Sequence, residues 1–274
     1  DIVAEMINLP ETMFPRCVKP DGAVGSPDIV CFSDGSMSAT CAVVYLRWKD
    51  ASGKVVGVFL LTSKTRVSPL KIESIPRLEL MSAVLGVRLV TRIIRALGLE
   101  GCRVFYIMDS TAALCMIVSD AGALSTFGSH RVGEIQSKSE KENFFHIAGT
   151  ANIADIATRR CTKLLSIRPG SPWQNGPQFL YEDVAKWPVK SALELGGQLP
   201  REELSAAAAR VMIVQGEAVC DIRNLIDINR FESLRQPKKI LGTVLLALYR
   251  FRNKRLTLVD KLPEPTFNQR LKTA

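Results

Sequence analysis

The chain has 274 residues, of which 47% are hydrophobic, so it can bury the core of one large domain or of two small ones. Its 36 Lys and Arg exceed its 27 Asp and Glu, which gives a formal net charge of +9. This composition excludes a disordered or fibrous protein, and no run approaches the ~18 apolar residues of a membrane span.

The positive charge is concentrated at the C-terminal end. Between Arg235 and Ala274 ten basic residues accompany only Asp260 and Glu264, so the first 234 residues are close to neutral. A basic segment of this kind suits a polyanion such as nucleic acid. Amphipathic helices with a solvated surface are an equally good explanation.

The seven cysteines indicate reduced thiols. They form no C-x-x-C pair, and their number is odd, which argues against a disulfide framework. Only His130 and His146 are present, so a zinc finger built from His and Cys is excluded.

The first elements are predicted to form an antiparallel meander. Residues 1–27 contain several Pro and Gly with little periodicity, which is typical of a linker. Apolar runs at 29–33, 42–48 and 55–62 then predict three strands, with a turn at 50–53 between the last two. Short turns between successive strands favour antiparallel pairing.

Helices and strands alternate after the meander. Ser74 and Pro76 mark a helix start, and apolar residues recur at helical spacing from Leu78 to Leu97. The elements expected next are a buried strand at 103–108, helices at 110–119 and 125–138, a strand at 143–147, and a helix carrying 155–160, capped by Thr150 or Asn152.

The fold class predicted is α/β, a mixed sheet of a three-stranded antiparallel meander plus parallel strands, flanked by helices, with a C-terminal helical extension. We expect no regular structure at 168–177, and helices at 202–214, at 222–234 and from Pro237. The predicted divisions are a linker at 1–27, the α/β domain at 28–165, a connector rich in Pro, Gly and Trp at 166–200, and a basic helical module at 201–274.

Four acidic residues fall where this topology brings element ends together. Asp109 ends the buried strand, and reactive groups in open α/β sheets gather beyond the carboxyl ends of strands. Asp34, Glu79 and Asp155 are expected at the same edge. Taken singly, each has an ordinary explanation, such as a turn or a helix dipole. Together they would repel one another unless a hard cation such as Mg²⁺ offset their charge.

The motifs around these acids resemble the Asp-Glu-Asp-Asp set of the ribonuclease H family. They are Phe-Ser-Asp34-Gly-Ser, Arg-Leu-Glu79-Leu, Met-Asp109-Ser and Asn152-Ile-Ala-Asp155. Longer strings, including Ser74-Ile-Pro-Arg-Leu-Glu-Leu-Met and Trp173-Gln-Asn-Gly-Pro, resemble the ribonuclease H region of BEL/Pao-type retrotransposon polyproteins over about residues 29 to 190. The pattern departs from that family at Thr40-Cys41 and His130.

The resemblance implies a metal-dependent endonuclease that hydrolyses the RNA strand of RNA/DNA hybrids. Two Mg²⁺ ions roughly 4 Å apart would share Asp34, with Glu79 and Asp109 on one ion and Asp155 on the other, and with Mn²⁺ as a substitute. Hybrid contacts are expected from Gly35, Ser36, Arg77, Ser110 and Asn152. His146 is a candidate proton shuttle, although its place on a strand favours a structural role.

The resemblance also implies a cellular setting and partners. In such polyproteins this region lies between reverse transcriptase and integrase segments, so we expect a piece of a longer chain, in a cytoplasmic particle or the nucleus, with no membrane partner. A retroviral integrase places its Glu last, and a proofreading exonuclease has Asp-x-Glu on its first strand. Neither pattern is present here. The remaining alternative is a catalytically silent scaffold or connection-type domain that binds nucleic acid or protein partners.

Overall fold

The structure, a computed structural model, describes residues 17–70, 73–159, 164–167, 170–196 and 199–204. Contacts divide the chain into two compact units, Asp1–Val211 and Met212–Ala274, and every described residue belongs to the first. Most of the predicted linker, the helices expected at 222–234 and from Pro237, and the basic segment lie outside the described residues. The predicted domain divisions therefore stay predictions.

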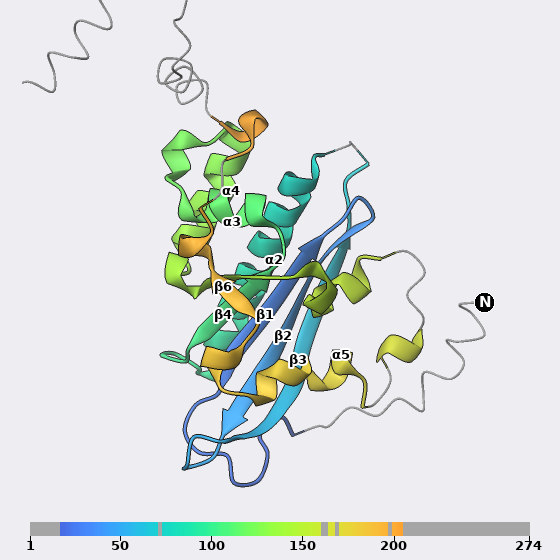
Figure 1. Cartoon of the computed structure of the whole chain (residues 1–274), viewed down its shortest axis with the longest axis vertical. Helices are drawn as coiled ribbons and strands as arrows, with labels where there is room; N and C mark the ends of the chain where they lie inside the picture. The colour runs from blue at the N-terminus through green and yellow to red at the C-terminus, as the bar shows by residue number, and fades with distance from the viewer. Residues whose placement is uncertain (1–16, 71–72, 160–163, 168–169, 197–198, 205–274) are drawn as a thin grey trace, which may run out of the picture. The chain divides into compact units, whose positions relative to one another are not determined.

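A six-stranded mixed sheet forms the centre of the domain, in the order β3-β2-β1-β4-β5-β6 (Figure 1). Its strands are β1 (Asp28–Gly35), β2 (Ala39–Lys49), β3 (Val55–Val67), β4 (Val104–Met108), β5 (Phe144–Ile147) and β6 (Val189–Ser191). Strands β1 to β3 pair antiparallel, β1 pairs parallel with β4 and β4 with β5, and β6 closes the edge antiparallel to β5. The predicted fold class, a meander followed by parallel strands, is confirmed.

Strand β1 is an interior strand of the sheet, and every one of its residues is buried. It lies between β2 and β4, and an apolar run without alternation suits a strand that is covered on both faces. Since β1 and β4 are parallel, their carboxyl ends meet at one edge of the sheet. Asp34 lies at the end of β1, and Asp109 directly follows β4.

One face of the sheet is covered by helices α2 (Ile75–Leu97), α3 (Thr111–Val118) and α4 (Thr126–Gln136). Pro76 lies in the first turn of α2, as predicted, although the Ser74 side chain makes no capping hydrogen bond. Gly98 ends the helix in the left-handed conformation, with φ of 63°. Leu80, Val87 and other apolar residues of α2 pack on β1 and β2.

The opposite face is covered by the connector, here residues 170–196. Its buried Trp173, Leu180 and Trp187 pack on the far side of β1 and β2, where Figure 1 shows the segment crossing the strands. The expectation of no regular structure at 168–177 was wrong, because α5 (Pro172–Asn175) lies there. Strand β6 was not predicted, since a three-residue strand has no periodicity of its own.

Two further expectations can be compared with the described residues. The helix predicted at 202–214 begins instead with the short 3₁₀ turn Arg201–Glu203, followed by a β-bridge from Leu204 to Leu124. The rest of that helix lies outside the described residues. The five cysteines that the structure describes are free thiols.

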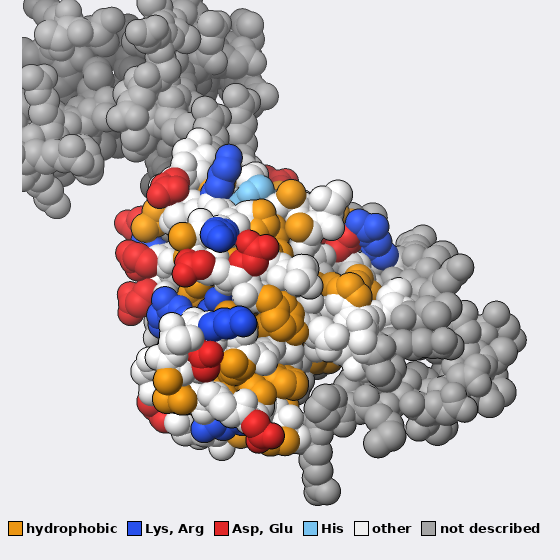
Figure 2. Space-filling view, turned by 60° about the horizontal axis from the view of Figure 1, so that its bottom comes forward, with side chains coloured by type: hydrophobic (Ala, Val, Ile, Leu, Met, Phe, Trp, Pro, Cys, Tyr) orange, Lys and Arg blue, Asp and Glu red, His pale blue; other side chains and the backbone are white. Residues whose placement is uncertain are grey.

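The surface of the described part carries both signs of charge. Figure 2 shows acidic, basic and apolar side chains interspersed over the face in view, which agrees with the near-neutral charge of the first 234 residues. No helix among the described residues has the length and apolar character needed to cross a bilayer.

Candidate metal centre

Three of the four predicted acids meet at the carboxyl edge of the sheet. Asp34 is the penultimate residue of β1, Glu79 lies near the start of α2, and Asp109 follows β4 directly. Each offers a carboxylate oxygen, and these oxygens all lie within 4.8 Å of one another. We call Asp34, Glu79 and Asp109 the acidic trio.

The spacing and chemistry of the acidic trio fit a small divalent cation. Mg²⁺ binds oxygen at about 2.1 Å, so two ligands on opposite sides of one ion lie about 4.2 Å apart. A small side-chain adjustment or a bridging water would therefore bring the trio into one coordination sphere. Three carboxylates are the hard oxygen donors that Mg²⁺ and Mn²⁺ prefer.

Without a cation, burial and mutual repulsion raise the free energy of the ionised carboxylates in this cluster. Asp34 and Glu79 are only 6% and 7% exposed. Burial raises the pKa of Glu79 to about 9, and the charges of Asp34 and Asp109 add to the effect. Burial also raises the pKa of Asp34, although a hydrogen bond from Thr158 opposes that change. The fold thus favours protons or metal ions at this edge.

Asp155 lies outside the acidic trio. It belongs to the 3₁₀ helix Ile153–Ala157 rather than to the predicted α-helix, and its carboxylate forms an ion pair with Arg159. Its side chain is 23% exposed, and its charge still contributes to raising the pKa of Asp34 and Glu79. Asp155 is therefore close enough to act on the trio electrostatically without sharing its ligand geometry.

Thr158 also contacts the acidic trio, and it was not among the predicted site residues. Its buried hydroxyl donates to the Asp34 carboxylate, and it lies one turn after Asp155. The string Asp155-Ile-Ala-Thr-Arg contained the signal, because residues three apart share one side of a helical turn. Thr158 fixes the orientation of Asp34.

Asn152 and Gly149 position Asp109. The Asn152 amide donates to Asp109 Oδ1 and to the Ser33 carbonyl, both at 3.0 Å, and its own oxygen caps the following 3₁₀ helix. Gly149 approaches Asp109 so closely that an added Cβ would lie 2.8 Å from Oδ2. Asn152 was predicted to contact the hybrid. In the structure its side chain is buried and hydrogen-bonded to the Asp109 carboxylate.

His146 also supports Asp109, through the backbone. It lies on β5, as predicted, and its Nε2 is 3.1 Å from the Asp109 carbonyl oxygen. This contact fits the structural role that its place on a strand favours.

The other predicted hybrid contacts lie close to the trio. The Gly35 N–H donates to Glu79 Oε2 at 3.1 Å, and an added Cβ there would meet the Leu78 carbonyl at 2.5 Å. Glycine at 35 thus permits the close approach of α2, where the sequence suggested the approach of a ligand. Ser36 bonds the Thr158 carbonyl at 3.0 Å, and Ser110 caps α3 by accepting from the Ala113 N–H.

Arg77 is engaged by protein groups. Its guanidinium pairs with Glu203, which is fully buried, and with Glu73 at 3.1 Å, and it stacks over Phe127 with 4.6 Å to the ring centroid. The Ser125 hydroxyl donates to the same Glu203 carboxylate at 2.6 Å. No local pattern could reveal a partner 126 residues away.

The order and pairing of the six strands are those of a ribonuclease H-like fold, and the acidic trio lies at the carboxyl edge of this sheet. Residues 1–110 match the sequence model of one family, described as the Pao retrotransposon-like RNaseH-like domain. The matched stretch contains the whole trio but not Asp155. The resemblance to the ribonuclease H region of Pao-type retrotransposons is thereby confirmed over these residues.

The NurA nuclease from Sulfolobus solfataricus aligns with a TM-score of 0.24 and 11% identity over 54% of this chain and 56% of its own. A TM-score this low does not establish a shared fold, and the alignment spans little more than half of that nuclease. No curated protein matches the sequence.

Proposed function

We propose that this domain is a metal-dependent endonuclease that hydrolyses the RNA strand of RNA/DNA hybrids. The observation that carries the proposal is the convergence of Asp34, Glu79 and Asp109 from three separate elements, with oxygens within 4.8 Å. Negative charges gathered at a largely buried edge repel one another, and a bound cation would relieve that repulsion. The match to a retrotransposon RNaseH-like domain supports the proposal.

The chain's own residues hold and orient the metal ligands. Asp34 is fixed by Thr158, Glu79 by the Gly35 N–H and Asp109 by Asn152. Asp155 is the proposed fourth ligand, and it would have to exchange its ion pair with Arg159 for a metal. Bound divalent cations would supply a hydroxide-like nucleophile and stabilise the leaving 3′ oxygen, which gives 5′-phosphate and 3′-hydroxyl ends.

Specificity for RNA would come from contacts to 2′-hydroxyls. Gly35, Ser36 and Ser110 lie next to the acidic trio and remain candidates for these contacts, although each already makes a hydrogen bond within the protein. Arg77 would need to leave Glu203 before it could bind a phosphate.

The proposed setting is a retrotransposon polyprotein. Its reverse transcriptase would make the hybrid, and the integrase segment would follow in the same chain, in a cytoplasmic particle or in the nucleus. The family match supports this setting.

A catalytically silent scaffold is the second candidate. The observation that favours it is the ion pair between Asp155 and Arg159, which leaves three carboxylates in the shared cluster.

A cleavage assay separates the two candidates. Labelled RNA/DNA hybrid and duplex DNA are incubated with Mg²⁺ and either the wild-type chain or Asp109→Asn. Cutting of the hybrid only, lost in the variant, is the result expected of the enzyme. An inert wild type across Mg²⁺ and Mn²⁺ concentrations would contradict the enzyme and favour the scaffold.

A further inference from the structure

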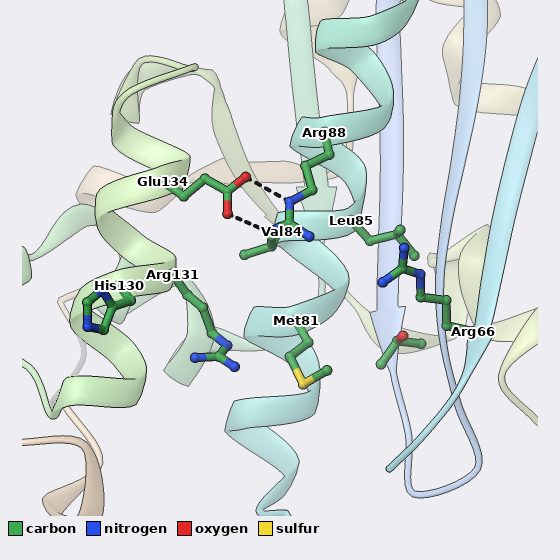
Figure 3. A pocket seen from close by; sticks show the side chains of 9 residues that line it. Arg66, Met81, Val84, Leu85, Arg88, His130, Arg131 and Glu134 are labelled. Atoms are coloured by element: carbon green, nitrogen blue, oxygen red, sulfur yellow. Dashed lines mark hydrogen bonds and ion pairs between the residues drawn. The ribbon is translucent and has the colours of Figure 1, made fainter.

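A groove lined by arginines lies on the helical face of the domain, apart from the acidic trio. It is a cavity of about 280 Å³ between α2, α4 and the end of β3. Figure 3 shows Arg66 reaching in from one side and Arg131 from the other, with Met81 and Leu85 of α2 between them. We call this cavity the arginine groove.

The charge of the groove is not fully balanced by its lining. Arg88 is satisfied by Glu134, with two hydrogen bonds of 2.7 and 2.6 Å. Neither Arg66 nor Arg131 makes an ion pair within the part of the chain that the structure describes. The groove therefore offers two guanidinium groups to an anion.

Arg131 is held in place and is electrostatically strained. Its guanidinium lies 3.4 Å from the centroid of Phe127 and donates to the Phe127 carbonyl at 3.0 Å. Partial burial lowers the pKa of Arg131, and repulsion from Arg77 and Arg88 acts in the same direction, although attraction from Glu73 and Glu203 opposes it. An arginine fixed among other cations is a favourable partner for a phosphate.

The groove begins close to the metal centre. Gly35 pairs with Thr40, and Thr40, which lines the groove, pairs with Arg66. Neighbouring strands are about 4.8 Å apart, so the backbone of Arg66 lies roughly 10 Å from that of Gly35. At about 3.4 Å of helix axis per nucleotide, this distance corresponds to roughly three nucleotides. Cross-strand partners face the same side, and the Gly35 position faces α2.

We propose that the arginine groove binds the phosphodiester backbone of the nucleic acid whose RNA strand is cut at the acidic trio. The proposal rests on the proposed function and extends its site. Arg66 and Arg131 contact phosphates from opposite walls. Met81, Val84 and Leu85 form an apolar floor against the sugars.

The test is the salt dependence of hybrid binding, measured by fluorescence anisotropy. All 274 residues are kept, and the protein carries Asp109→Asn so that the hybrid stays intact. In this background, Arg66→Ala/Arg131→Ala is compared with Arg92→Ala/Arg95→Ala. The control removes two exposed arginines of α2 that do not line the groove. Both double variants therefore lose the same charge.

The groove variant is expected to bind about tenfold more weakly near 0.1 M salt, with a slope of log affinity against log salt that is smaller by about 1.8. The control should match the parent. An equal loss in both double variants, or no loss in either, would overturn the proposal. Unchanged hybrid binding with lost binding of a poly-glutamate peptide would assign the groove to an acidic peptide instead.

Two further measurements keep the outcomes separate. Arg66→Ala by itself, at an exposed edge position, should lower the slope by about 0.9 and serves where the double variant fails to fold. Cleavage by the chain with Asp109 intact is scored independently. No cleavage with a lowered slope refutes the nuclease and keeps the groove, whereas cleavage with an unchanged slope refutes the groove.

Discussion

Each carboxylate of the acidic trio has a protein partner that fixes it. Thr158 donates to Asp34, the Gly35 N–H donates to Glu79, and Asn152 donates to Asp109. None of these partners is a basic side chain, so the acids are oriented but not neutralised. A site of this kind is pre-organised for a cation, because the repulsion that remains is relieved only by protons or metal.

The raised pKa of Glu79 predicts how stability depends on pH without divalent ions. A carboxyl whose pKa rises on folding from 4.5 to about 9 favours the folded state most below pH 4.5, and that contribution is lost as the pH rises toward 9. Urea unfolding should therefore show the wild type to be less stable at pH 9 than at pH 5, by about 1 kcal/mol or more. Glu79→Gln should flatten this dependence, and an equally steep dependence in the variant would contradict it.

Gly149 provides a steric test of the position of Asp109. In Gly149→Ala the new Cβ would lie 2.8 Å from Asp109 Oδ2, so the carboxylate must move. We expect Mg²⁺ affinity, measured by calorimetry, to fall about tenfold, which corresponds to about 1.4 kcal/mol. Gly133→Ala is the matched control, because nothing lies within 4 Å of its Cβ. Equal affinities for the two variants would show that this contact does not position Asp109.

At the scale of elements, the connector covers the face of the sheet opposite the helices α2, α3 and α4. Arg47 of β2 fastens it, donating to the Leu180 carbonyl at 2.7 Å and to the Glu182 carbonyl at 2.6 Å. The same buried guanidinium pairs with Asp28 at 2.6 Å and lies over Trp187. One side chain thus joins the start of β1 to the segment that buries the far face.

Removing this fastening should destabilise the whole domain. Arg47→Ala leaves two carbonyls without their donor and weakens the pairing of buried Asp28, at a cost of about 3–5 kcal/mol. Arg103→Ala removes another partner of Asp28, but one that is 57% exposed, and it should cost about 1 kcal/mol or less. Chemical denaturation of both variants checks the difference. If Arg47→Ala lowered the free energy of unfolding as little as Arg103→Ala does, the packing of the connector's tryptophans would be what mainly holds it on the sheet.

At the scale of the molecule, regular periodicity determined what could be predicted from sequence. The meander, α2 and the strand before Asp109 have strong apolar patterns, so their ends, and with them the trio, could be placed. Strand β6 and the Arg77–Glu203 pair depend on contacts between distant segments, which local patterns do not contain. Asp155 was predicted on an α-helix, but the structure has a 3₁₀ helix at this segment. Short α- and 3₁₀-helices have similar sequences, so the pattern could not separate them.

The central claim is that Asp34, Glu79 and Asp109 form one cation site, and thermal unfolding with and without Mg²⁺ at pH 8 tests it most directly. At about 100 times Kd, binding contributes about 2.7 kcal/mol, which should raise the Tm of the wild type by roughly 5–10 °C. Asp109→Asn should abolish the rise, whereas Asp120→Asn, at an exposed acid away from the trio, should keep it. No rise in the wild type, or an equal rise in Asp109→Asn, would contradict the claim.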